Sequence, residues 1–301
     1  MKAIQKNENG VEIVEITKPI PKKGEVLINV ALAGYCRTDG YVAKDIIKTK
    51  KPLTLGHEFS GVVEEIGENV SKCSIGDHVS VMPILKENDH YSGKMLGVDL
   101  DGAFAEFIVV PEELIYIIPK TVSFIHGAYA EPIAASLAVT RLRKPKESHG
   151  VVVGKNRIAS LTHYLLEVSG FTNVKNVSLE ELKNVANETF DFAIETFVDQ
   201  DSINEIIRTL KVRGVCVLKS RIQKEVLINV GMVVKKEIII QGLYYGDFQE
   251  ALNLLAENKI SIDNYLGDVV SFEKAIEIIN SELREDKKTF FTNKKEFLKK
   301  A

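Results

Sequence analysis

The sequence predicts an α/β protein of two domains, one rich in β-strands and one in which strands alternate with helices. The chain has 301 residues, which is enough to form two hydrophobic cores. Residues 1–122 contain many short strands separated by turn signals, a pattern typical of a small barrel or sandwich. Residues 123–263 alternate strands with helices, which predicts a parallel sheet covered on both faces.

The periodicity of apolar residues predicts each element in turn. In the first part we expect strands at 11–16, 25–33, 59–67, 76–81 and 103–110. In the second part we expect strands at 150–154, 173–177, 190–194, 215–218 and 237–242, with helices at 125–142, 155–168, 179–186 and 202–210. The tail has amphipathic helices at 247–257 and 272–283, and its basic end, 287–300, is expected to be a solvated surface segment.

Composition limits the partners and the compartment. The net charge is −3 and the sequence pI is near 6.1, which argues against a nucleic-acid partner. No apolar run approaches the roughly 18 residues of a membrane span. The three cysteines, Cys36, Cys73 and Cys216, are far apart and odd in number, so they form no disulfide framework. We therefore expect a soluble cytoplasmic protein with no membrane partner.

Two short segments bring metal-ligand types together. Cys36 is followed by Arg37, Thr38 and Asp39, and a second segment contains Gly56, His57 and Glu58. Thiolate, imidazole and carboxylate groups are ligands of zinc, and a catalytic zinc needs a third protein ligand. Glu58 and Glu131 are both candidates for that ligand. Spacing alone fits a zinc site and a pair of buried core residues equally well.

The order of the motifs carries a family resemblance. Gly-Tyr-Cys-Arg-Thr-Asp at 34–39, Gly-His-Glu-Phe-Ser-Gly-Val-Val-Glu-Glu-Ile-Gly at 56–67 and Gly-Asp-His-Val at 76–79 resemble the medium-chain zinc-dependent alcohol dehydrogenases. Residues 97–111 are similar to their threonine and polyol (sorbitol) dehydrogenase branch. The resemblance implies a GroES-like catalytic domain at 1–122, completed by 264–301, and a Rossmann-like nucleotide-binding domain at 123–263.

The resemblance also implies a role for each site residue. Cys36 and His57 match the zinc ligands, and Glu58 or Glu131 matches the carboxylate that completes the site. Thr38 matches the hydroxyl that passes the substrate proton to solvent. The remaining two matches are Asp39, which orients the ligand histidine, and Arg37, which contacts the cofactor pyrophosphate.

Two departures concern the metal and the phosphate turn. The stretch 82–95, where many relatives carry four cysteines, has none, so we expect one catalytic zinc and no structural zinc. The segment Gly154-Lys155-Asn156-Arg157-Ile158-Ala159 stands where the fingerprint G-x-G-x-x-G/A is expected. Asn156 therefore places a side chain where backbone normally approaches the pyrophosphate.

A third departure is length. Between the helix near residue 168 and the strand at 190–194 there is room for one strand, 173–177, and a short helix. If that strand is the second of the sheet, Ser178 takes the place of the acidic residue that binds the adenosine ribose. If it is the third, the second strand is missing. In both cases the cofactor is NAD or NADP with no preference indicated.

The predicted function is zinc-dependent hydride transfer between a secondary alcohol, a polyol or amino alcohol, and NAD(P). The partners are then a small alcohol or ketone and further copies of the chain in a homodimer or homotetramer, with 237–241 as a sheet edge that pairs between subunits. The alternative is a non-enzymatic zinc- or nucleotide-binding member of the superfamily, favoured by Asn156 and the missing carboxylate. A zinc-free quinone or enoyl reductase is disfavoured because those relatives lack the ligand pair.

Overall fold

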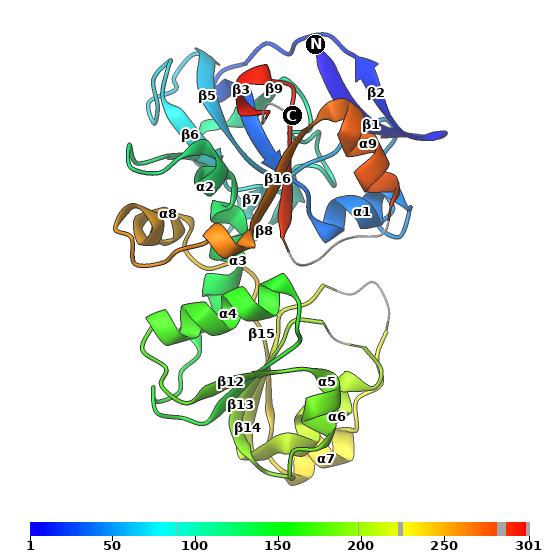
Figure 1. Ribbon diagram of the computed structural model, residues 1–301, viewed down its shortest axis with the longest axis vertical. Coiled ribbons are helices and arrows are strands. Elements are labelled where there is room, and N and C mark those ends of the chain that lie inside the picture. Colours follow the sequence, from blue (N-terminus) through cyan, green and yellow to red (C-terminus); the bar gives the residue numbers. More distant parts are fainter. Residues whose placement is uncertain (89, 198, 222–224, 282–286, 299–301) are drawn as a thin grey trace. The chain divides into compact units, whose positions relative to one another are not determined.

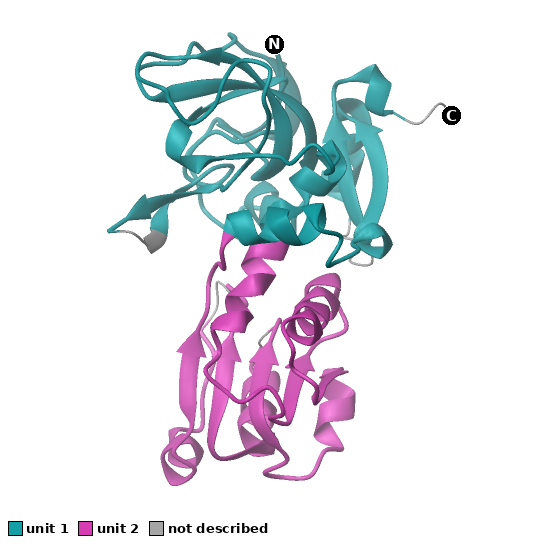
Figure 2. Cartoon of the chain, turned by 90° about the vertical axis from the view of Figure 1, so that its left-hand side faces the viewer, with its two compact units in different colours: residues 1–132, 248–301 teal, residues 133–247 magenta. Residues whose placement is uncertain are grey.

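The chain forms two compact units. The computed structural model describes residues 1–88, 90–197, 199–221, 225–281 and 287–298 (Figure 1). Unit 1 contains Met1–Pro132 and Phe248–Ala301, and unit 2 contains Ile133–Asp247 (Figure 2). Within the described residues, no helix has the length and apolar character that crossing a membrane requires.

Unit 1 is built on a sheet of seven strands in the order β10-β6-β5-β3-β17-β16, with β9 also paired to β3. Their bounds are β3 Glu25–Gly34, β5 Glu58–Ile66, β6 His78–Val81, β9 Phe107–Pro111, β10 Ile115–Ile117, β16 Leu266–Ser271 and β17 Lys288–Thr292. Apolar side chains of these strands form the core, with Phe59, Phe104 and Phe291 fully buried in it. The predicted GroES-like, β-rich domain is thus confirmed.

Smaller elements surround this sheet. A second sheet has the order β2-β1-β4, and β7 and β8 form a separate hairpin. Their bounds are β1 Lys2–Asn7, β2 Gly10–Glu15, β4 Leu53–Thr54, β7 Ile84–Glu87 and β8 His90–Met95. The helices are α1 Arg37–Ala43, α2 Phe124–Ala128, α8 Phe248–Ala256 and α9 Phe272–Asn280, while α3 Ala130–Leu137 begins in unit 1. Short 3₁₀ turns lie at Glu112–Leu114, Asp263–Tyr265 and Lys295–Phe297.

The first part of the basic end, 287–300, is not the surface segment that the sequence predicted, and residues 299–300 lie outside the described part of the chain. Within it, Lys288–Thr292 form β17, which lies between β3 and β16 and pairs antiparallel with β3 through Phe291 and Ala33. Phe290 and Phe291 are fully buried, so the burial of two aromatic rings decides the placement of an otherwise lysine-rich segment.

The unit boundaries lie at 132/133 and 247/248, whereas the sequence predicted 122/123 and 263/264. Helix α2 packs on the main sheet of unit 1, where the Ser60 hydroxyl donates to the Phe124 carbonyl and the Ser80 hydroxyl to the Gly127 carbonyl. The ring of Phe248, at the start of α8, lies 4.8 Å from that of Tyr116. These contacts attach both flanking segments to unit 1.

Unit 2 is a parallel sheet of five strands in the order β12-β11-β13-β14-β15. The strands are β11 Gly150–Val153, β12 Val174–Val177, β13 Phe190–Glu195, β14 Leu210–Leu218 and β15 Ile239–Gly242. The helices are α4 Arg157–Val168, α5 Leu179–Lys183, α6 Ser202–Thr209 and α7 Val230–Lys235, with a 3₁₀ turn at Ala138–Arg141.

Helices cover both faces of this sheet (Figure 1). On one face α4 packs against Val152, and on the other α5, α6 and α7 pack against Val151 and Val153. Successive residues of β11 therefore point to opposite covered faces, which explains its continuous apolar run. Because β12 pairs directly with β11, it is the second strand of the doubly wound order, and the described residues contain no third strand beyond it. The predicted reduced Rossmann-like sheet is confirmed.

Candidate functional site

The pairing of two strands brings the two candidate metal-ligand segments together. β3 and β5 run antiparallel with Gly34 opposite Glu58. Cys36 follows the end of β3 and caps the start of α1, while His57 directly precedes β5. A cysteine and a histidine that are distant in sequence thus meet at one end of the same strand pair.

Three possible ligand groups converge at this point. One ligand atom from each of Cys36, His57 and Glu58 lies within 4.8 Å of the other two. His57 Nε2 is buried, has no hydrogen-bond partner among the described residues, and lies 3.9 Å from Glu58 Oε1. An unpartnered buried nitrogen is unfavourable unless something satisfies it. Thiolate, imidazole and carboxylate are the donor set that zinc prefers, so these residues fit a zinc ion.

Asp39 fixes both ligand-bearing segments. Its Oδ1 accepts hydrogen bonds from His57 Nδ1 and from the Gly56 amide, each at 3.1 Å, and its Oδ2 accepts one from the Cys36 amide at 2.8 Å. Asp39 is fully buried. The contact to Nδ1 leaves Nε2 directed at the cluster, as a carboxylate does behind a metal-ligating histidine.

The electrostatic environment of the cluster favours a cation. Burial opposes a charge on His57, but the Asp39 carboxylate and the Cys36 sulfur outweigh burial and raise the pKa of His57 well above its usual range. In the absence of a metal ion, protonation of the His57 imidazole supplies the positive charge that this environment favours.

Gly56 is required immediately before the histidine. Its φ is +95°, and a β-carbon added there would lie 2.3 Å from Cδ1 of Phe104. Only glycine meets both conditions without displacing the buried ring. Gly56 therefore allows the backbone conformation that places His57 at the cluster.

Lys288 is a site residue that the sequence analysis missed. Its Nζ forms a buried ion pair with Glu58 Oε2, and both side chains are at most 2% exposed. Lys288 lies in β17, which the sequence analysis placed on the surface. The run Thr-Phe-Phe-Thr after Lys288 is the signal that indicates a buried strand there.

Three further residues of unit 1 were predicted to belong to the site: Thr38, Glu131 and Arg37. The Thr38 hydroxyl is 3.9 Å from Cys36 Sγ. Glu131 is buried near the start of α3, and the group of three converging ligands does not include it. Arg37 is half-buried as the first residue of α1. Their roles in proton transfer, metal binding and pyrophosphate binding stay predictions.

The predicted phosphate turn joins β11 to α4 in unit 2. Gly154 has a φ of +133°, and a β-carbon added there would lie 2.4 Å from the Thr196 hydroxyl oxygen. Asn156 has an ordinary extended backbone with φ −83°, and its side-chain oxygen accepts the Ala159 amide at 2.9 Å. The turn thus needs glycine at its first position, because φ is positive and space is short there. At Asn156 the backbone angle suits any residue, so glycine is normally favoured there only because it leaves room for the pyrophosphate.

The remaining predicted turn residues lie around this helix start. Arg157 and Ile158 are the first two residues of α4, and Lys155 precedes them with its side chain half-exposed. Ser178 directly follows β12, and its hydroxyl caps α5 by accepting the Glu181 amide at 3.1 Å. Of the two placements that the sequence left open, the structure has β12 as the second strand, with Ser178 where an acidic residue is usual.

Comparison with known proteins agrees with this architecture. The model of the alcohol dehydrogenase GroES-like domain family matches residues 22–120. The starvation-sensing protein RspB of Escherichia coli K12 is 30% identical over 73% of this chain and 69% of its own length. (R,R)-butanediol dehydrogenase of Bacillus subtilis is 27% identical over 90% of this chain and 92% of its own length.

A solved structure supports the same assignment. The crystal structure of 2R,3R-butanediol dehydrogenase from Bacillus subtilis superposes with a TM-score of 0.84 at 25% identity, covering 97% of this chain and 99% of that one. Fold and cluster together define a medium-chain dehydrogenase with a zinc-type ligand set. The chain belongs to the medium-chain zinc-dependent alcohol dehydrogenase superfamily.

Proposed function

We propose that this protein transfers a hydride between a secondary alcohol, of the polyol or amino-alcohol class, and NAD(P), with one zinc ion at the cluster of Cys36, His57 and Glu58. The observation that carries the proposal is the buried, unpartnered Nε2 of His57, which lies close to the two other ligand groups. Relatives named butanediol dehydrogenase, D-xylulose reductase and L-threonine 3-dehydrogenase support this substrate class.

The residues of unit 1 would bind the metal, orient its histidine ligand and transfer the substrate proton. A zinc ion held there supplies Lewis-acid chemistry that lowers the pKa of a bound alcohol. Asp39 keeps the imidazole of His57 in the orientation that presents Nε2. The Thr38 hydroxyl, near Cys36 Sγ, would accept the substrate proton and pass it on, since a hydroxyl relays protons better than it holds them. Glu131 remains the second candidate carboxylate for the site.

The residues of unit 2 would hold the nucleotide. The nicotinamide cofactor accepts or donates the hydride. Gly154 and the start of α4 would receive the pyrophosphate, with Lys155, Asn156, Arg157 and Ile158 around it. Arg37 is proposed to contact the cofactor pyrophosphate. With the stretch 82–95 lacking cysteine, we propose a single zinc site per chain.

Metal analysis combined with cofactor titration tests the proposal. The purified protein is expected to contain about one zinc per chain, to bind NAD(H) or NADP(H), and to reduce the nucleotide with butane-2,3-diol, xylitol or L-threonine. Bound zinc without binding of either nucleotide at millimolar concentration would favour the alternative, a non-enzymatic zinc-holding member. Asn156 in the phosphate turn and Ser178 after β12 are the observations that support that alternative.

We also propose that two copies pair along β15. This strand is the last in the order of its sheet, and Ile239 and Ile240 are 56% and 38% exposed on it. An apolar sheet edge invites pairing with a second strand. Light scattering after gel filtration is expected to give a dimer or tetramer, and Ile239→Lys is expected to lower the mass. A cytoplasmic location is proposed from the absence of disulfides among Cys36, Cys73 and Cys216.

A further inference from the structure

The carboxyl ends of β11 and β12 lie side by side in unit 2. The Gly154 amide donates to the Val177 carbonyl at 2.8 Å, which joins the phosphate turn to the residue before Ser178. In dinucleotide-binding folds the adenosine ribose lies between these two strand ends, where an acidic residue binds its hydroxyls. Ser178 is not acidic, and its hydroxyl already accepts the Glu181 amide.

A carboxylate nevertheless lies at this point, and it comes from the next helix. The side chain of Glu181 folds back so that Oε2 accepts the Ser178 amide at 2.6 Å. The same oxygen is 3.1 Å from Lys155 Nζ, which also donates to the Asn176 carbonyl at 3.1 Å. Both contacts fall on Oε2. Oε1 takes part in neither of them and remains able to accept.

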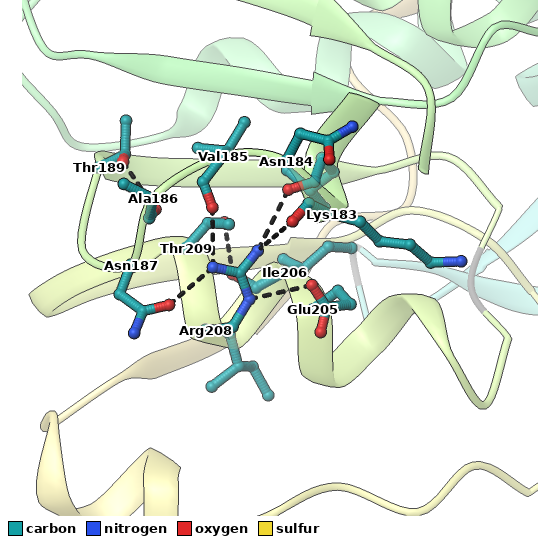
Figure 3. Close-up of polar contacts among 12 residues, drawn as sticks. Lys183, Asn184, Val185, Ala186, Asn187, Thr189, Glu205, Ile206, Arg208 and Thr209 are labelled. Carbon is teal, nitrogen blue, oxygen red and sulfur yellow. Dashed lines mark hydrogen bonds and ion pairs between the residues drawn. The ribbon is translucent and has the colours of Figure 1, made fainter. Parts of the chain in front are cut away.

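Arg208 holds the helix that carries Glu181 (Figure 3). Its guanidinium donates to the carbonyls of Leu182, Lys183 and Val185 at 3.2, 3.4 and 2.8 Å. It also bonds Asn187 Oδ1 at 2.7 Å and Glu205 Oε2 at 2.9 Å. These bonds anchor the carboxyl end of α5 to α6. The amino end of α5, with Glu181, is consequently fixed relative to the end of β12.

We propose that Glu181 supplies the carboxylate that binds the 2′- and 3′-hydroxyls of the adenosine ribose, and that the protein therefore prefers NAD(H) to NADP(H). The inference rests on the proposed nucleotide-dependent function. Oε1 accepts the ribose hydroxyls while Oε2 keeps its contacts to Ser178 and Lys155. A 2′-phosphate at the same point would meet a carboxylate of like charge, which is unfavourable at short distance.

The charge state of Glu181 suits this role. The Ser178 amide and the Lys155 ammonium hold the pKa of Glu181 below its usual range, so the side chain is ionised at neutral pH. Lys155 is the one cation in contact with this carboxylate among the described residues, and its two contacts direct it to Glu181 and to the Asn176 carbonyl. The neighbouring Glu180 instead pairs with Lys183 at 2.9 Å.

Fluorescence titration of the full-length protein with NADH and with NADPH tests the inference. Wild type is expected to bind NADH at least about tenfold more tightly than NADPH. Glu181→Gln is expected to weaken NADH binding about tenfold, because hydrogen bonds to a charged acceptor are stronger than those to a neutral one. The same variant should bind NADPH as well as wild type or better. Glutamine retains the capping contact to Ser178, so α5 is expected to stay folded.

Glu180→Gln is the matched control, since it removes the same charge one position away. It is expected to leave the ratio of the two dissociation constants unchanged. Wild-type preference for NADPH, or an unchanged ratio in Glu181→Gln, would overturn the inference alone. No binding of either nucleotide by wild type at millimolar concentration would overturn the proposed function, and the inference with it.

Discussion

Lys288 and Glu58 are 230 residues apart in the chain and form a buried ion pair at the cluster of candidate metal ligands. The pair uses Oε2 of the carboxylate, while Oε1 lies 3.9 Å from His57 Nε2. Lys288 therefore compensates the charge of Glu58 and sets which oxygen is directed at the cluster.

Removing this lysine is expected to destabilise unit 1. Lys288→Met leaves a buried carboxylate without its partner, a change that typically costs about 3–5 kcal/mol. The midpoint of urea unfolding should fall clearly, and the double variant Lys288→Met with Glu58→Gln should recover much of the loss. Lys287→Met, at an exposed neighbouring position, is the control and should change little. An unchanged midpoint in Lys288→Met would show that the pair adds nothing to folding.

Replacing a proposed ligand is expected to remove the metal. Cys36→Ser and His57→Gln should each reduce bound zinc from about one per chain to near zero, because each removes a donor that faces the same point. Cys73→Ser is the control, because Cys73 lies outside the cluster; this variant should retain about one zinc per chain. Elemental analysis of the purified variants gives the stoichiometry. Full zinc content in Cys36→Ser would place the metal elsewhere.

Asp39 is expected to tune the metal affinity without binding the metal. Asp39→Asn weakens the contact to His57 Nδ1 and disturbs the amide contacts to Cys36 and Gly56. Loss of such a partner typically lowers metal affinity about 10- to 100-fold. Competition with a zinc-binding dye measures the change. Asp45→Asn removes a carboxylate that pairs with Lys6 and Lys51 instead, and equal weakening in that control would contradict the positioning role.

The three thiols are expected to react at different rates with a disulfide reagent. Burial raises the pKa of Cys216 to about 12 and also raises the pKa of Cys73. At pH 8 only about one in ten thousand Cys216 thiols is then ionised, and the thiolate is the reactive form. In native protein stripped of zinc, Cys36 should react first, and added zinc should protect it. Labelling followed by peptide mass spectrometry identifies the order. Early reaction of Cys216 would contradict its burial.

Asp191 is expected to make unit 2 sensitive to acid. Partial burial raises its pKa, but the Lys211 ammonium at 2.9 Å and the His149 amide at 2.8 Å outweigh burial, and the net pKa is lowered. The stabilisation is complete above the unfolded-state value of about 3.9 and disappears as pH falls through the lower folded-state pKa.

Comparison of Asp191→Asn with wild type tests that assignment. The variant should be less stable by about 1 kcal/mol at pH 7, and the difference should vanish near pH 2. Chemical unfolding followed by circular dichroism at several pH values measures both stabilities. A difference that is constant with pH would show that ionisation of Asp191 is not involved.

Local patterns predicted much of the fold and the centre of the site. Alternating apolar residues located most strands, and the motifs around Cys36 and His57 indicated the candidate ligand pair that the pairing of β3 and β5 brings together. β17 could not be predicted in the same way, because its place between β3 and β16 depends on partners that are remote in sequence. Lys288 was missed for that reason.

Glu181 was missed for a different reason. Its spacing from Ser178 is the S-x-x-E pattern of a capping box, which the sequence displays openly. The pattern identifies a helix start, but only the parallel pairing of β12 with β11 shows that this helix start lies beside the phosphate turn. The proposed binding role of this capping motif therefore depends on the topology of the sheet.

The position of β17 also has a consequence for protein synthesis. Unit 2 is translated completely before residues 248–301, so its whole sheet can form while the ribosome is still extending the chain. Unit 1 cannot close its sheet until β17 leaves the ribosome and inserts beside β3. Until then Glu58 lacks the compensating charge of Lys288. We therefore expect stable zinc loading to follow the emergence of β17, and a product terminated before residue 288 to be incompletely folded around the candidate ligands.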